Sequence, residues 1–210
     1  MSGAGWGRKG AALCLVAFVL GCGSSLPPTH YYVIEIDPVA ADAARTASAV
    51  AAPPALVVGV RPFAVDAPYD QDRIVYRVGE GSAEVGFYSY HLWAAPLQTM
   101  LPAAVATGLE GTSGVSEIEP IVSGRRYDAF LHGRVSAVEE IDLADRQVVR
   151  AVIELRLVGL DGAELWADVV SARSETRTDE VGVGVDSLST ALAEALAGAR
   201  ESMGRAWSTP

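Results

Sequence analysis

The sequence has 210 residues and a formal net charge of −10, with half of its residues hydrophobic and a fifth charged. A chain of this length can bury the core of one domain. Its acidic balance argues against a broad electrostatic surface for nucleic acid or for an anionic membrane. The acids are scattered rather than clustered, which indicates an ordinary solvated surface.

The N-terminal 22 residues have the pattern of a secretory signal that ends in a lipidation site. Arg8 and Lys9 precede an apolar run, residues 11–20, which is too short to cross a hydrocarbon core of about 30 Å. The run ends in Val-Leu-Gly-Cys, which resembles the bacterial lipobox. The small Gly21 lets the signal peptidase grip the extended chain, and the Cys22 thiol accepts diacylglycerol. We therefore expect residues 1–21 to be removed and Cys22 to be lipidated.

Processing changes both the cysteine content and the charge of the chain. Cys14 leaves with the signal, so the folded domain has no disulfide and no free thiol. Arg8 and Lys9 leave with it and no acid does, which changes the formal charge from −10 to −12. The amine freed at Cys22 can accept a further acyl chain such as palmitate, which makes the anchor stable. Residues 22–30 form the predicted tether.

The first elements after the tether are two strands separated by a loop. Residues 31–36 are β-branched and aromatic, which predicts a strand. The Ala-rich stretch 38–54, bounded by prolines, predicts a surface loop with one helical turn near 40–47. Residues 55–60 form a continuous apolar run, which is typical of a strand buried on both faces. The pair Arg61-Pro62 ends this strand or leaves it at an edge.

A hairpin rich in aromatic residues follows. Residues 73–78 and 84–90 predict two strands, and the glycine-containing stretch 79–82 predicts the turn between them. Five aromatic residues gather here and are candidates for partner binding: Tyr76, Phe87, Tyr88, Tyr90 and Trp93. Either the hairpin is part of the core, or its aromatics form a contact surface for a partner or lipid. Alternation places Phe87 and Tyr88 on opposite faces; we assign Tyr88 outward and leave Tyr90 undecided.

A helix is predicted after Pro96, a residue that suits a first helical turn. Apolar residues recur at helical spacing up to Leu109. Pro102 falls inside this pattern, so either the helix kinks there or it begins nearer Leu101. The stretch 111–114 ends it.

The second half predicts three long strands and a C-terminal helix. The strands are 127–140, 147–160 and 164–176, an antiparallel meander with one solvated face. Asp186 or Ser187 caps the helix. Its apolar face comprises Leu188, Leu192, Ala195, Leu196, Ala199, Met203 and Trp207. The sequence Gly182-Val183-Gly184 before it is interpreted as a flexible turn.

The predicted fold class is α/β (α+β-like), with a mainly antiparallel sheet, a β-hairpin extension and two packing helices in a single domain, 31–207. No residue pattern in it predicts catalysis. His30, His91 and His132 have no second ligand at metal-binding spacing, and the nucleophile elbow and the EF-hand loop are both missing from the sequence. We predict no catalytic residue, no cofactor and no metal site.

The order of several short motifs resembles a known family. Tyr31-Tyr32-Val33-Ile34 follows the lipidation cysteine, Val58-Gly59-Val60-Arg61-Pro62 ends the second strand, and Leu92-Trp93-Ala94-Ala95-Pro96-Leu97 joins the hairpin to the helix. With the Ile74-Val75-Tyr76-Arg77 strand, this order is similar to that of the ABC-type transport auxiliary lipoprotein family, the PqiC-like proteins, over nearly the whole mature chain. The resemblance implies an accessory, non-enzymatic subunit of an ABC-linked lipid transport system that maintains membrane integrity. Its implied partners are MCE-domain proteins and ABC transporter components.

Some alternatives remain open at this stage. A lipoprotein activator of a peptidoglycan synthase is the second function considered, and an envelope hydrolase is the third. Phospholipid and a second copy of the chain are further partners that the sequence leaves undecided; nucleic acid is not expected. Position 23 is Gly rather than the Asp that retains many lipoproteins in the inner membrane. We therefore expect an anchor in the outer membrane with the domain facing the periplasm, and the inner membrane is the alternative.

Overall fold

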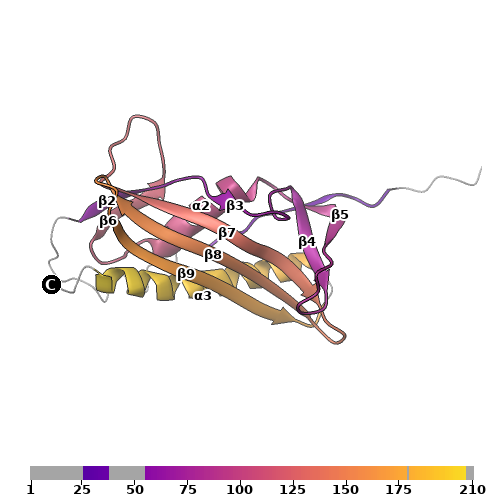
Figure 1. Ribbon diagram of the computed structural model, residues 1–210. Coiled ribbons are helices and arrows are strands. Elements are labelled where there is room, and N and C mark those ends of the chain that lie inside the picture. The colour runs from indigo at the N-terminus through magenta and orange to yellow at the C-terminus, as the bar shows by residue number, and fades with distance from the viewer. Residues whose placement is uncertain (1–25, 38–54, 179, 207–210) are drawn as a thin grey trace, which may run out of the picture.

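The computed structural model describes residues 26–37, 55–178 and 180–206. Within them, a nine-stranded mixed sheet packs against two helices (Figure 1). In chain order the elements are β1 (His30–Tyr32), β2 (Leu56–Val60), β3 (Ala64–Val65), β4 (Arg73–Val78), β5 (Gly86–Trp93), α2 (Leu97–Leu109), β6 (Val115–Pro120), β7 (Ala129–Asp142), β8 (Gln147–Gly159), β9 (Glu164–Thr176) and α3 (Val181–Ala206). The predicted class, a sheet with a hairpin and two packing helices in one domain, is confirmed. The predicted signal peptide, Cys22, the loop 38–54 and Trp207 lie outside the described residues.

The 14-residue strand β7 holds the sheet together. One edge of β7 pairs with β8 in antiparallel fashion along its length, and β8 pairs with β9 in the same way. The other edge of β7 is shared by three short strands, β2, β3 and β4, which all pair with it in parallel. The predicted antiparallel meander therefore forms the long ladders, while shorter parallel pairings attach the first half of the chain.

The helix α3 covers one face of the long ladders. The face predicted from periodicity is buried, with Leu192, Leu196 and Met203 fully enclosed. The predicted start of α3 is wrong, because α3 begins at Val181 and the Gly182–Gly184 segment forms its first turn. A Cβ on Gly184 would lie 3.2 Å from Cγ1 of Val149. The lack of a side chain lets this turn approach the sheet closely, and local sequence gives no sign of that contact.

The helix α2 begins directly after Pro96 and continues through Pro102. The alternative in which it starts nearer Leu101 is therefore wrong. Its apolar positions, among them Leu97 and Leu109, lie in the same core as α3. This core occupies the space between the helices and one face of the sheet.

Two strand predictions need correction. The strand predicted over 31–36 ends at Tyr32, although Ile34 and Ile36 remain buried. The strand β6 was not predicted, and it pairs in parallel with the far edge of β2. That pairing places β2 between two neighbouring strands. Val58 and Val60 on one face are almost fully enclosed, and Tyr127 covers Gly59 on the other face, whereas Val57 is partly exposed. The predicted burial on both faces therefore holds only for the second half of the strand.

Candidate functional site

The predicted aromatic hairpin forms one corner of the sheet. β4 pairs with the last four residues of β7, and β5 pairs with β4. The N-terminal strand β1 adds to the outer edge of β5 in parallel, with His30 opposite His91 and Tyr32 opposite Trp93. Figure 1 shows β4 and β5 at the end of the molecule opposite to β2 and β6. The hairpin and the start of the folded domain therefore lie together.

The orientation predicted for Phe87 and Tyr88 is reversed in the structure. Phe87 is the outward residue, with 36% of its surface exposed. Tyr88 is half-buried, and its ring packs against Tyr76 with 4.9 Å between ring centroids. Its hydroxyl donates a hydrogen bond to Glu140. The buried carboxylate of Glu140 on β7, a partner that the local sequence does not show, accounts for the inward position of Tyr88.

The other aromatic candidates divide between core and surface. Trp93 is only 4% exposed and lies with Val181 and Leu188 of α3 in the core, so it is not available to a partner. Tyr76 and Tyr90 are half-buried. The prediction overlooked Tyr31, which is 66% exposed. The alternation of side chains along a short edge strand could have predicted that Tyr31 is exposed.

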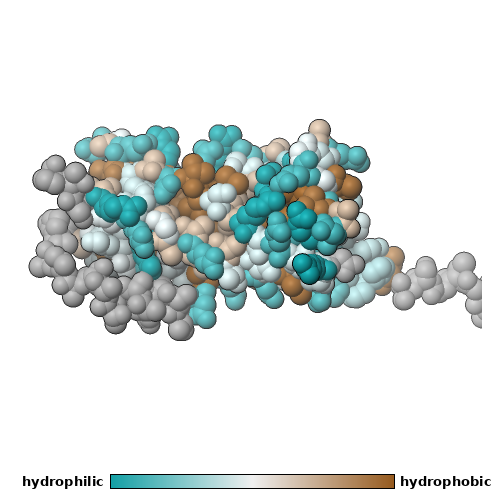
Figure 2. All heavy atoms as spheres, turned by 90° about the horizontal axis from the view of Figure 1, so that it is seen from below, coloured by the Kyte–Doolittle hydropathy of each residue, from teal (hydrophilic) through white to brown (hydrophobic). Residues whose placement is uncertain are grey.

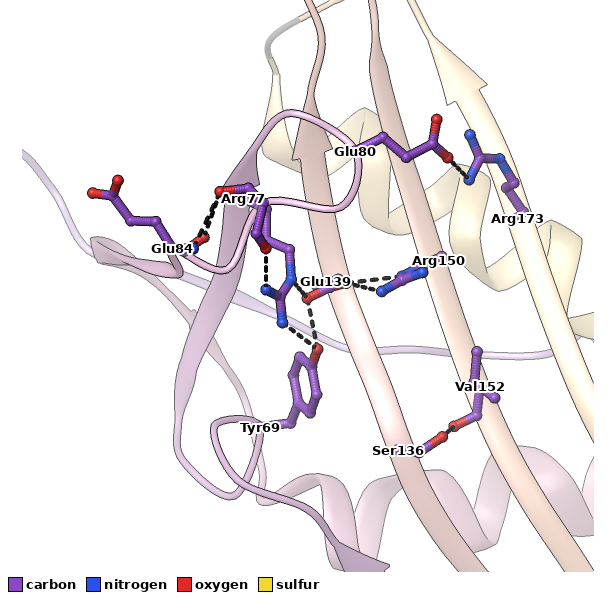
Figure 3. Close-up of polar contacts among 10 residues, drawn as sticks. Tyr69, Arg77, Glu80, Glu84, Ser136, Glu139, Arg150, Val152 and Arg173 are labelled. Carbon is purple, nitrogen blue, oxygen red and sulfur yellow. Dashed lines mark hydrogen bonds and ion pairs between the residues drawn. The ribbon is translucent and has the colours of Figure 1, made fainter.

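Two consecutive glutamates of β7 hold the hairpin from opposite faces. The side chains of Glu139 and Glu140 are both buried, and neighbouring residues in a strand point to opposite sides. Glu139 accepts hydrogen bonds from Nε of Arg77 and from the hydroxyl of Tyr69, both at 2.6 Å. From β8, Arg150 approaches the other oxygen of Glu139 at 2.5 Å. Figure 3 shows this network, in which Glu139 lies between the two guanidinium groups.

Charge and burial act against each other at Glu139. Burial alone raises the pKa of this carboxyl group, but hydrogen bonds from Tyr69, Arg77 and Arg150 outweigh it and hold the pKa below its ordinary value. The pKa of Arg77 is raised by hydrogen bonds to Tyr69 and Glu139. Glu139 is therefore an ionised carboxylate at neutral pH, and it fastens β4 and the loop carrying Tyr69 to the long ladders.

The second glutamate, Glu140, lies on the face covered by α3. It accepts a hydrogen bond from Tyr88 and a second one, at 3.1 Å, from Nε2 of Gln147. The first turn of α3 passes close to it, since a Cβ on Gly184 would lie 3.6 Å from Oε2 of Glu140. Burial, followed by the contact with Glu140, raises the pKa of Tyr88. The phenol therefore stays protonated and acts as a donor.

The turn of the hairpin reaches further over the open face of the sheet. Arg77 donates a hydrogen bond from Nη1 to the carbonyl oxygen of Ser82 at 2.7 Å. Glu80, in the same turn, pairs with Arg173 of β9 at 2.8 Å (Figure 3). This ion pair is largely exposed and contributes little to stability, but it shows that the hairpin turn leans across β8 towards β9.

A stack of rings attaches β1 to the hairpin. The ring centroids of His30 and His91 are 5.4 Å apart and the rings are nearly parallel. The hydroxyl of Tyr32 lies 2.8 Å from Nδ1 of His91. Burial, together with the neighbouring His30, lowers the pKa of His91. His91 therefore packs as a neutral ring at neutral pH.

The two buried carboxylates at this corner are taken up by contacts within the fold. The carboxylates of Glu139 and Glu140 are engaged by hydrogen bonds, and the cavity beside them has a volume of about 10 Å³, enough for one water molecule at most. Among the described residues, no three His, Cys, Asp or Glu side chains cluster in a way that could hold a metal ion. The exposed groups of the hairpin include apolar side chains such as Phe87 beside charged ones such as Glu80.

Comparison with known proteins identifies the family. The family model described as "ABC-type transport auxiliary lipoprotein component" matches residues 36–203. The chain belongs to this family. The family resemblance predicted from the order of the motifs is therefore confirmed. No curated protein matches the chain.

Two solved structures share the fold of this auxiliary lipoprotein. The crystal structure of protein XCC0632 from Xanthomonas campestris, described with family DUF330, has a TM-score of 0.62 at 14% identity, covering 82% of this chain and 92% of that one. The crystal structure of an uncharacterized protein has a TM-score of 0.54 at 15% identity, covering 85% and 98% respectively. At these identities the likeness concerns the fold alone. In the described part of the auxiliary lipoprotein, neither helix is long and apolar enough to cross a bilayer.

Proposed function

We propose that this auxiliary lipoprotein is an accessory subunit of an ABC/MCE-type lipid transport system, which acts by binding protein and phospholipid without catalysis. Family membership supports the link to an ABC transporter. The observation that carries the non-catalytic role is the engagement of both buried carboxylates, Glu139 and Glu140, in holding the hairpin. Groups that are fixed in this way position a surface and are unavailable for proton transfer to a substrate.

The contact with the MCE-domain partner lies on the outward side of the hairpin. Phe87 is exposed on β5, on the face opposite to Tyr88, and Tyr90 is half-buried. An aromatic side chain on a rigid support loses little conformational freedom on binding, which is the composition of an interface centre. This assignment replaces Tyr88, whose hydroxyl is bonded to Glu140.

The anchor is the lipid on Cys22, followed by the tether 22–30. Gly23 next to the lipidated cysteine favours sorting to the outer membrane, with the domain in the periplasm. Replacing Cys22 with Ser tests the anchor, because the variant has no thiol to accept diacylglycerol. We expect this variant to appear in the soluble fraction or as the unprocessed precursor. If the Ser variant is processed and is still found in the membrane fraction, lipidation is not the anchor.

Affinity capture from detergent-solubilised envelopes tests the role, with the partners identified by mass spectrometry. We expect the wild-type protein to retain an MCE-domain protein and an ABC transporter ATPase. Phe87→Ser should lose them while the protein remains folded, as its melting temperature shows. Leu160→Ser makes the same apolar-to-polar change at a 71% exposed residue in the β8–β9 turn and should retain them. Specific capture of a peptidoglycan synthase in their place would favour the alternative function.

A further inference from the structure

Exposed apolar side chains gather where the folded domain begins. Leu26 is 79% exposed, Tyr31 66% and Val33 43%. All three lie within eight residues of chain, on the short edge strand β1 and its flanks. Figure 2 shows hydrophobic surface, in brown, at the end of the molecule where the described chain begins. Exposed apolar side chains that gather in one short segment often mark a site of contact with a protein or a membrane.

The length of the tether limits how far this edge can be from the membrane. Eight peptide steps separate Cys22 from His30, which span at most about 29 Å when fully extended. A flexible chain of that length has a typical end-to-end distance of about 16 Å. The strand β7, from Ala129 to Asp142, extends over about 43 Å. The tether is therefore shorter than the domain that it holds.

The polarity of the sheet decides which end the tether can bring to the lipid. β1 pairs with β5, and β5 lies beside β4 at the Asp142 end of β7. The β8–β9 turn, which carries Leu160, lies at the opposite end, beside Ala129. In Figure 1 the indigo N-terminal segment leaves the molecule at the β4–β5 end. A lipid on Cys22 consequently brings β1 close to the membrane and leaves Leu160 far from it.

We propose that Leu26, Tyr31 and Val33 rest on the lipid surface, so that the folded domain lies against the membrane through its β1 edge. This rests on the proposed lipidation of Cys22. A tyrosine is well suited to the headgroup region, since its ring is apolar and its hydroxyl remains wet. Among the described strands, none pairs with the backbone groups on the outer edge of β1, and such groups are costly in hydrocarbon. The contact is therefore interfacial and shallow.

The charges around this edge decide which lipid it prefers. Glu35 and Glu180 are both exposed near it, and the mature chain is acidic as a whole. A contact of this kind draws on apolar burial, because acidic groups repel anionic headgroups. The edge should therefore favour zwitterionic phosphatidylcholine over a membrane rich in phosphatidylglycerol.

The cysteine content of the chain permits a direct test on the intact lipoprotein. In the mature protein the Cys22 sulfur is blocked by its lipid, so a single introduced cysteine can be labelled with a polarity-sensitive fluorophore. Tyr31→Cys and Val33→Cys report on the proposed contact. Leu160→Cys and Val169→Cys, at residues 71% and 58% exposed, are the matched controls. Each lipidated variant is incorporated into phosphatidylcholine vesicles after its melting temperature has been compared with that of the wild type.

We expect the emission at positions 31 and 33 to shift to the blue in vesicles and to be quenched by brominated phosphatidylcholine. The probes at 160 and 169 should keep their aqueous emission and remain open to iodide. Replacing part of the phosphatidylcholine with phosphatidylglycerol should reduce the shift at position 31.

Three results would overturn the inference, and they are distinguishable. If mass spectrometry finds no lipid on Cys22, both the anchor and the membrane contact are wrong. If the lipid is present but iodide quenches positions 31 and 160 equally, the anchor stands and the contact is wrong. A probe at 31 that is shielded in native envelopes but not in vesicles would assign this edge to a protein partner.

Discussion

The hydroxyl of Tyr88 on β5 reaches past β4 to donate a hydrogen bond to Glu140, a buried carboxylate on β7. On the opposite face of the sheet, Arg77 of β4 makes the corresponding contact with Glu139. Two consecutive residues of β7 therefore hold the hairpin. Glu140 contacts β5 on one face of the sheet, and Glu139 contacts β4 on the other. This arrangement makes the hairpin part of the rigid sheet, and it permits direct tests.

Tyr88→Phe should lower the free energy of unfolding by about 1–3 kcal/mol, because Glu140 loses a donor while remaining buried. Chemical denaturation measures this. Tyr31→Phe is the matched control: Tyr31 is largely exposed, and its change should stay within about 0.5 kcal/mol. Equal midpoints for the two variants would contradict the role of the Tyr88 hydroxyl.

Arg77→Met retains the aliphatic stem but removes the charge next to Glu139. Removing one partner of a buried ion pair costs up to about 3–5 kcal/mol, and the remaining contact with Arg150 should keep the loss towards the lower end. Arg173→Met, which removes the exposed pair with Glu80, should cost about 1 kcal/mol or less. Thermal and urea unfolding distinguish these outcomes. A similar loss of unfolding free energy in both variants would show that the buried Arg77 contact contributes no more than the exposed Arg173 pair.

Acid should destabilise the protein through Glu139. Because its pKa in the folded state is below its ordinary value, the stabilisation is fully present above the unfolded-state pKa of about 4.3 and is lost as the pH falls through the folded-state pKa. Urea unfolding at a series of pH values should show a shallower acid decline for Glu139→Gln than for the wild type. Unchanged slopes would mean that Glu139 does not contribute.

His91 supplies an internal control for this experiment. Its pKa is also lowered, by burial and by His30, so its stabilisation is present above about pH 6.5 and falls below it. Glu139→Gln should leave this decline below about pH 6.5 in place, whereas His91→Gln should reduce it; the pKa of His132 is also lowered, by burial and by Arg61, so part of the decline should remain.

Gly108 and Gly198 lie in the two helices and should respond oppositely to alanine. A Cβ on Gly108 would lie 2.6 Å from Cδ1 of Leu196, whereas nothing lies within 4 Å of one on Gly198. Gly198→Ala should stabilise the protein by about 0.5–1 kcal/mol through helix propensity. Gly108→Ala should destabilise it by about 1–3 kcal/mol, because α2 and α3 must move apart. Stabilisation by both changes would show that the helix crossing is loose; melting temperatures measure the difference.

Local patterns were sufficient where a residue's surroundings repeat along the chain. The strands β7, β8 and β9 were predicted to within about two residues, because apolar residues alternate along most of one face of each. The buried face of α3 was predicted for the same reason. The signal segment and Cys22 depend on a linear motif that the processing enzymes recognise in an extended chain, so sequence alone defines that prediction.

The tertiary structure decided everything that depends on a distant partner. β6 and the parallel pairing of β2 with β7 join segments some 60–70 residues apart, and no local pattern encodes that choice. Alternation showed that Phe87 and Tyr88 face opposite ways, but the phase was set by Glu140, 52 residues beyond Tyr88. The glycines in the first turn of α3 were interpreted as a flexible turn, because the local sequence does not show their contact with the sheet. Periodicity is a property of a segment, whereas burial, register and charge pairing are properties of two segments brought together, and these determined which surface the protein presents.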